Sequence, residues 1–191
     1  MLDDRELLDG IRKRDPEAFR ALMGRHAKHL INLAYRFLGT VADAEDVAQD
    51  VFFRLYEHPP TLHPSTKFST WLYRVTANRC LDLLRAKSRR PKMVPLEIPN
   101  PEDPEAQSSS QQLTSPAANP RDQIAQKETA TATRAAIATL PLELRSPLLL
   151  STIEELSQET IAQILGISAK AVERRIHRAR VILKERLAAY L

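Results

Sequence analysis

The stretch from residue 93 to residue 123 most constrains the fold of this chain, because its composition cannot support a packed element. It contains six prolines, four serines, five acidic residues and a single cation, Arg121. A segment with so few apolar side chains cannot offset the entropy that its backbone would lose on ordering. We therefore expect a flexible acidic linker over 93–123, which separates a unit at 1–92 from a second unit at 124–191.

Both flanking units carry the periodicity of α-helices. Apolar residues recur every three to four positions, strand-like alternation is nearly absent, and the 191 residues include only four glycines. The sequence predicts an all-α protein with two small helical domains. In addition to a helix-turn-helix near the C-terminus, helices are predicted over residues 16–38, 42–58, 68–87, 124–140 and 144–153.

Charge is segregated along the chain, although the net charge is only +4. Residues 41–57 carry five acids and one arginine, whereas residues 74–92 carry seven cations and one acid. A second basic segment, residues 170–186, has seven cations and two acids. The chain therefore has two segments suited to phosphate and one suited to a basic partner.

The sequence LSQETIAQILGISAKAVERRIHRARVIL predicts a helix-turn-helix. Ser157 and Ser168 are placed to cap its two helices, and Gly166 can adopt the left-handed backbone of the turn between them. An apolar stripe on the second helix leaves a polar face for the major groove of DNA. That face consists of Lys170, Glu173, Arg174, His177 and Arg178. The alternative, a solvated basic face of an ordinary bundle helix, is weakened by the preceding glycine turn and the density of cations.

The sequence KFSTWLYRVTANRCLDLLRAKSRR places aromatic rings beside cations. The chain has five Phe, four Tyr and one Trp, and three of these rings, Phe68, Trp71 and Tyr73, fall in this stretch. Unstacked bases gain about 1–3 kcal/mol each by stacking on aromatic faces, while arginines follow the phosphates. The stretch therefore suits single-stranded nucleic acid. The alternative is that the rings belong to the core and the cations to a solvated helix end.

A polar face of the helix predicted over 42–58 contains Asp46, Gln49, Asp50 and Arg54. The helix macrodipole alone favours acids near a helix start, and this is a sufficient explanation for them. In a chain that binds DNA, however, an acidic face cannot dock on phosphate. We therefore interpret it as a contact with another protein.

No pattern in the chain predicts catalysis. His26, His29, His58, His63 and Cys80 do not have the spacing of a tetrahedral metal site. There is also no glycine-rich phosphate loop or nucleophile motif. We expect no enzymatic activity, no cofactor and no metal. The single cysteine, and the lack of a leader or a long apolar run, predict a cytoplasmic protein without direct membrane insertion.

Taken together, these motifs resemble a bacterial RNA polymerase sigma factor of the extracytoplasmic-function group. Region two of that family is matched by DPEAFRALMGRHAKHLINLAYRFLG, by DAEDVAQDVFFRLYEH and by FSTWLYRVTANRCLDLLRAKSRR. Region four is matched by LPLELRSPLLLSTIEELSQETIAQILGISAKAVERRIHRAR. Nearly all of the chain matches, and four motifs in the family order are more specific than a lone helix-turn-helix.

The resemblance implies a sigma factor that binds core RNA polymerase, directs it to promoters and helps to open the DNA. The protein would contact the clamp and the flap of the polymerase large subunit. The face that docks on the clamp would contain Asp46, Gln49, Asp50 and Arg54. The separated non-template strand of the minus-ten element, with one base flipped out, would be contacted by the loop and the basic helix end, including Trp71, Tyr73, Asn78, Arg79, Lys87, Arg89 and Arg90. The minus-thirty-five element would be contacted by Lys170, Glu173, Arg174, His177 and Arg178.

The resemblance also implies regulation by a second protein. Members of this group are commonly held inactive by an anti-sigma factor, often membrane-bound, which masks the polymerase-binding and DNA-binding faces of both domains. The acidic linker would thread through the polymerase toward its RNA channel.

Two segments depart from the family pattern. The sequence HPPTLHPS stands where relatives usually have an Arg-Gly-containing loop, and Ala-Val-Glu-Arg-Arg at 171–175 replaces Thr-Val-Lys-Ser-Arg. A carboxylate at Glu173 either accepts a hydrogen bond from cytosine or repels phosphate, so the promoter sequence stays open. The competing interpretation is a helix-turn-helix regulator that binds duplex DNA without polymerase.

Overall fold

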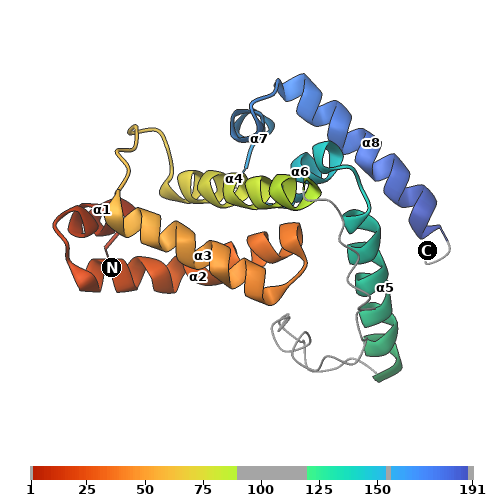
Figure 1. Ribbon diagram of the computed structural model, residues 1–191, viewed down its shortest axis with the longest axis horizontal. Coiled ribbons are helices and arrows are strands. Elements are labelled where there is room, and N and C mark those ends of the chain that lie inside the picture. Colours follow the sequence, from red (N-terminus) through yellow and green to blue (C-terminus); the bar gives the residue numbers. More distant parts are fainter. Residues whose placement is uncertain (1, 90–119, 154–155, 189–191) are drawn as a thin grey trace.

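The computed structural model describes residues 2–89, 120–153 and 156–188 (Figure 1). Within these ranges it consists of α-helices and connecting turns without a β-strand, which confirms the predicted all-α class. The helices are α1 (Asp4–Arg12), α2 (Pro16–Leu38), α3 (Val41–Glu57), α4 (Phe68–Arg89), α5 (Pro120–Ala138), α6 (Leu142–Leu150), α7 (Gln158–Leu165) and α8 (Ala169–Leu187). None of the helices in the described part is long and apolar enough to cross a membrane.

The N-terminal half is built on three helices, α2, α3 and α4, that lie side by side (Figure 1). Local signals set the ends of α2: the Asp15 carboxylate accepts from the backbone N–H of Glu17 at 2.9 Å, Pro16 occupies the first turn, and Gly39 ends the helix at φ 85°. The core between the three helices contains the fully buried Leu22, Val47, Leu55, Leu72 and Cys80.

The first helix, α1, is absent from the sequence-based prediction. It is nine residues long and begins with a capping box, in which Asp3 accepts from the N–H of Glu6 and the Glu6 side chain accepts from the N–H of Asp3. It buries Leu7, Leu8 and Ile11 against the rest of the domain. A Cβ atom at Gly10 would lie 2.6 Å from the Cβ of Ala18, so a glycine is needed where α1 approaches α2.

In the C-terminal half, α7 and α8 form the predicted helix-turn-helix. The Ser157 and Ser168 hydroxyls accept from the N–H groups of Thr160 and Ala171, each at 3.2 Å, and Gly166 adopts φ 66°. The apolar stripe predicted to be buried on α8 consists of Val172, Ile176, Ala179, Leu183 and Leu187. The first three are buried, whereas Leu183 and Leu187 are only partly buried, and α6 packs against α8.

The predicted linker lies mostly outside the described residues, so it remains a prediction over 93–119. Its last four residues, 120–123, are helical in this structure, because α5 begins at Pro120. Proline is well tolerated at a first helical position, since its missing N–H has no intrahelical acceptor there.

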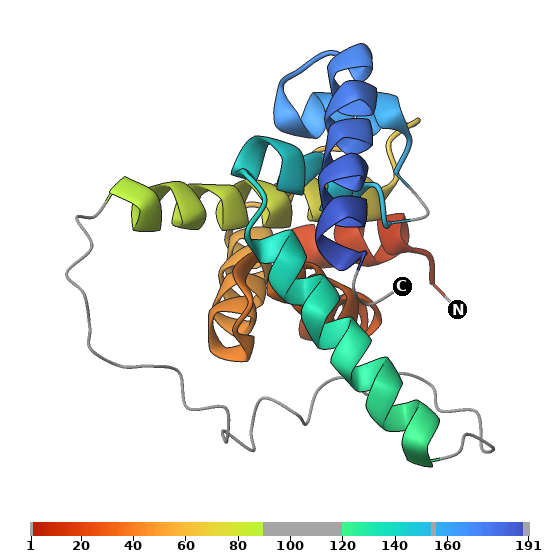
Figure 2. The ribbon, with the colours of Figure 1, turned by 90° about the vertical axis from the view of Figure 1, so that its right-hand side faces the viewer.

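The two halves contact each other through α4 and through the end of α2. In both views α4 lies between α2 and α3 on one side and α7 on the other (Figures 1 and 2). Arg145 of α6 donates from Nη2 to the carbonyl oxygen of Phe37 at 3.3 Å, and Arg36 donates from Nη1 to Oγ1 of Thr152 at 2.7 Å. Burial at this contact lowers the pKa of Arg145.

Candidate polymerase and promoter interfaces

The predicted acidic face lies on the outside of α3. All four predicted residues are exposed, because helical spacing places them opposite the buried side of α3: Asp46, Gln49, Asp50 and Arg54. Asp46, Gln49 and Arg54 form no ion pair or side-chain hydrogen bond with any described residue. The structure therefore brings these four side chains to one surface and leaves three of them available to a partner.

Of the three rings predicted beside the basic segment, Trp71 alone is partly exposed. Phe68 is 3% exposed and stacks on Trp71 from inside, with ring centroids 5.8 Å apart and 28° between the planes. Tyr73 is 8% exposed and shares a stripe of α4 with Ala77 and Cys80, which are both fully buried. The ring of Tyr73 therefore packs in the core of the free protein, and its contact with a base stays a prediction.

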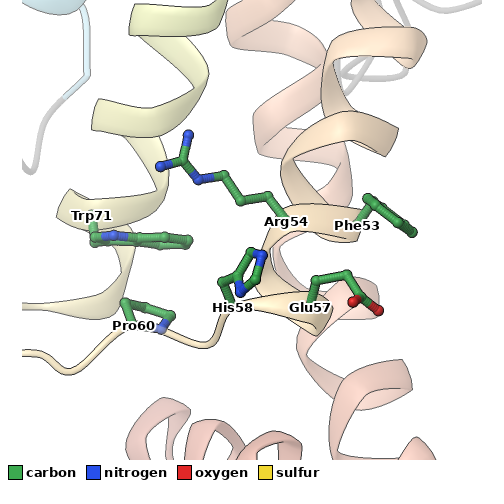
Figure 3. A pocket seen from close by; sticks show the side chains of 6 residues that line it. All are labelled: Phe53, Arg54, Glu57, His58, Pro60 and Trp71. Atoms are coloured by element: carbon green, nitrogen blue, oxygen red, sulfur yellow. The ribbon is translucent and has the colours of Figure 1, made fainter.

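Trp71 and Arg54 line two neighbouring hollows between α3 and α4. The first is also lined by Phe53, Glu57, His58 and Pro60 and has a volume of about 550 Å³. Figure 3 shows Arg54 reaching from α3 toward α4, with Trp71 on the facing helix and His58 and Pro60 in the chain below.

The second hollow is lined by residues that were predicted to contact two different partners, the polymerase and the minus-ten element. It is lined by Asp50 and Arg54 from the acidic face and by Trp71, Asn78 and Arg79 from the predicted minus-ten set. Its volume is also about 550 Å³. The two predicted interfaces are therefore contiguous.

Two ion pairs connect the acidic helix to the basic helix. Nε and Nη2 of Arg79 donate to Oδ2 of Asp50 at 3.0 and 2.8 Å, and Nζ of Lys87 donates to Oδ2 of Asp43 at 2.8 Å. The hydrogen bond from Lys87, and after it that from Thr40, lowers the pKa of Asp43. Two cations predicted to bind DNA are thus neutralised by carboxylates of α3 in this structure.

The rest of the predicted minus-ten set lies near the end of α4. Asn78 and Lys87 are exposed. Arg89 is the last residue of α4, but its side chain, like the whole of Arg90, lies outside the described residues.

The predicted minus-thirty-five residues form one exposed face of α8. Lys170, Glu173, Arg174, His177 and Arg178 are all exposed, and none forms an ion pair or side-chain hydrogen bond with a described residue. The opposite side of α8 is buried against α6 and α7. This is the arrangement that leaves a recognition helix free to enter a major groove.

Reactive groups among the described residues do not form a chemical centre. Burial raises the pKa of Cys80 to about 12, so its thiol is neither a nucleophile nor a metal ligand near neutral pH. No group of His, Cys, Asp or Glu side chains in the described part is arranged to hold a metal ion.

Comparison with known proteins gives matches in both halves. The family model of Sigma-70 region 2 matches residues 22–90, and that of Sigma-70, region 4 matches residues 131–183. The chain is 33% identical to the ECF RNA polymerase sigma factor SigW of Bacillus subtilis, over 93% of this chain and 92% of SigW. It is 29% identical to the ECF RNA polymerase sigma-E factor of Escherichia coli K12, over 94% and 91%.

Solved structures agree with these matches. The structure of CnrH in complex with the cytosolic domain of CnrY is similar with a TM-score of 0.65 and 27% identity, over 97% of each chain. The sigma factor RpoE of Bartonella quintana, solved with the anti-sigma factor NepR, has the same fold, with a TM-score of 0.62, 19% identity and coverage of 89% and 96%. These findings favour a sigma factor over a regulator that acts without polymerase. The chain belongs to the extracytoplasmic-function group of sigma-70 factors, which are non-enzymatic initiation factors that direct RNA polymerase to promoters.

Proposed function

We propose that this sigma factor holds the polymerase clamp and the opened promoter strand on adjacent surfaces of α3 and α4. The observation that carries the proposal is the shared lining of the two hollows by Arg54 and Trp71. Asp46, Gln49 and Asp50 present acceptors to a basic clamp surface on one side of Arg54. On its other side, Trp71 offers a ring to an unpaired base.

The minus-ten element is bound as a single strand in this proposal. A flipped base enters a hollow and stacks on Trp71, which is worth about 1–3 kcal/mol by comparison with other aromatic platforms. Asn78 lines the second hollow and provides both a donor and an acceptor for a base edge. Arg79, Lys87, Arg89 and Arg90 supply charge along the strand.

The minus-thirty-five element is bound as a duplex by the exposed face of α8. Arg174 and Arg178 lie one helical turn apart and can reach guanine or phosphate in the major groove. Lys170, Glu173 and His177 complete the surface that meets the DNA.

An anti-sigma factor is the second protein partner in this proposal. The structurally similar RpoE was solved with the anti-sigma factor NepR, which supports a partner of the same class here. Phe53 is 68% exposed next to Arg54, and aromatic residues and arginine are enriched at protein interfaces. The same surface of α3 would then bind either the polymerase clamp or the anti-sigma factor, which compete for it.

The proposal is tested by separating the two binding activities. Asp50→Arg should abolish binding to core polymerase, whereas the control Glu17→Arg, which alters an exposed acid on α2, should not. Trp71→Ala should retain polymerase binding and lose transcription from a library with a randomised minus-ten element, and Trp71→Phe should retain part of it. Normal holoenzyme formation by Asp50→Arg, or an unchanged transcript profile for Trp71→Ala, would remove the corresponding assignment.

A further inference from the structure

The loop over residues 58–67 forms one wall of the first hollow but has little internal support. It contributes His58 and Pro60 to the hollow and contains three prolines, which lack an N–H donor. Among the described residues, the one backbone hydrogen bond within this loop runs from the N–H of Thr66 to the carbonyl of His63 at 2.9 Å. Nδ1 of His63 also lies 2.8 Å from Oγ of Ser65 and accepts from the N–H of Ser65 at 3.3 Å, but within this loop, all of which the structure describes, no hydrogen bond holds residues 59–62. Contacts from outside therefore contribute to fixing the shape of the loop.

Two arginines of α1 provide those contacts. Nη2 of Arg5 donates to the carbonyl oxygens of His63 and Thr66, each at 3.2 Å, and to that of Pro64. At the other end of the loop, Nη2 of Arg12 donates to the carbonyl oxygen of Pro60. Because Nη2 carries two hydrogens, at least one of the three carbonyl contacts of Arg5 is a shared hydrogen bond, and the planar guanidinium holds this donor in place.

A second route connects α1 to the same hollow through side chains. Asp4 accepts from Nη1 of Arg25 at 3.0 Å, and its other oxygen lies 2.9 Å from Nε2 of His26. The His26 ring meets the edge of Phe68 with centroids 5.4 Å apart, and Phe68 stacks on Trp71. The loop wall and the tryptophan of the hollow are thus both braced by α1.

We propose that Arg5 and Arg12 are positioning residues, which set the conformation of the 58–67 loop and thereby the base preference of the hollow beside Trp71. This inference rests on the proposed minus-ten role of the hollow. The helix that carries both arginines precedes residues 22–90, which the region 2 model matches. A determinant of promoter choice therefore lies outside the segment expected to contact the promoter.

The test is transcription by core polymerase and full-length protein from a library in which only the minus-ten element is randomised. In Arg5→Ala the loop loses the contacts of Arg5 with its three carbonyl oxygens. We expect the ratio of transcripts with the preferred base to transcripts with the other bases, at one promoter position, to fall about fivefold, which is the effect of losing one net hydrogen bond. Arg5→Lys keeps a positively charged donor but lacks the planar guanidinium, so its base ratio should lie between those of the wild type and Arg5→Ala. Arg12→Ala should change the ratio at the same position from the other end of the loop.

Matched measurements separate positioning from a loss of structure. Arg20→Ala removes an exposed arginine of α2 that pairs with Glu17 and does not contact the loop, so its profile should equal that of the wild type. Polymerase affinity and thermal unfolding are measured for every variant. Unchanged base ratios in both Arg5→Ala and Arg12→Ala would overturn the inference, as would an equal loss at every promoter position accompanied by lower stability.

The failure of the underlying proposal has a different signature. If Trp71→Ala and the wild type share one profile, the hollow does not read the promoter and the inference falls with that role. If Trp71→Ala changes the profile and the arginine variants do not, the hollow reads the promoter without help from α1.

Discussion

Neutralising Asp50 should strengthen the binding of the free protein to single-stranded DNA while it weakens the binding to polymerase. Both donors of Arg79 that contact Asp50 must leave it before they can reach a phosphate. In Asp50→Asn the side chain keeps its shape and one acceptor but loses its charge. Arg79 is then held less tightly and becomes available to the DNA.

The exposure of the pair sets the size of the effect. Arg79 is 47% exposed and Asp50 is 55% exposed, so this is a surface ion pair, worth about 0.2–1 kcal/mol. The gain in affinity is therefore at most about fivefold, since 1.4 kcal/mol corresponds to a factor of about ten. One additional phosphate contact should also steepen the slope of log K against log salt by about 0.7 for a single strand.

The assay is fluorescence anisotropy of a labelled single-stranded oligonucleotide at several salt concentrations. Asp46→Asn is the matched control, because it makes the same change in net charge on the same face but breaks no ion pair with a described residue. In an Arg79→Ala background, Asp50→Asn should lose its excess effect over Asp46→Asn. Equal affinities and salt slopes for Asp50→Asn and Asp46→Asn would refute the idea that the pair restrains Arg79.

Other predictions concern the stability of the two domains. Leu72→Ala empties a fully buried site in the core and should cost about 2–5 kcal/mol in urea unfolding, and a loss below about 1 kcal/mol would contradict that burial. Ser157→Ala removes the cap of α7 and should cost about 1 kcal/mol by the same measurement, whereas Ser157→Asp should retain most of the stability. Cys80 should resist thiol reagents at pH 8 in the folded protein, because burial raises its pKa to about 12, and fast labelling under native conditions would show that α4 opens locally. Hydrogen bonds from Lys87 and Thr40 lower the pKa of Asp43, so its carboxylate contributes stability above the unfolded pKa that is lost as the pH falls through the folded pKa. Asp43→Asn should therefore reduce the loss of stability in acid, measured by urea unfolding at decreasing pH.

Features encoded by neighbouring residues were predictable from the sequence. The long helix α2 follows from Asp15, Pro16 and Gly39, which act within one turn of its ends. The helix-turn-helix likewise follows from two serine caps and Gly166. Exposure of the polar faces of α3 and α8 follows from periodicity alone, because a helix that buries one stripe must expose the opposite one.

Features that depend on packing between helices could not be predicted in this way. A helix as short as α1 is marginal by itself and is stabilised by burying Leu7, Leu8 and Ile11 against the other helices. Its two local signals, the spacing of Asp3 and Glu6 and the helical spacing of the three apolar residues, were overlooked. The burial of Tyr73 had a signal that was overlooked, namely its helical spacing to Ala77 and Cys80. No spacing in the sequence reveals the contacts of Arg5, since its acceptors are backbone carbonyls 58 to 61 residues away.

The segregation of charge along the chain has a consequence that the sequence pattern alone does not contain. Separate acidic and basic segments predict separate partners, yet the packing of α3 against α4 makes Asp43 and Asp50 the counterions of Lys87 and Arg79. A surface pair of this kind is weak enough for a phosphate or a polymerase cation to replace one member. Under the proposed function, a polymerase that engages Asp50 would release Arg79 for DNA, so the two binding events would favour each other and the free protein would bind DNA more weakly.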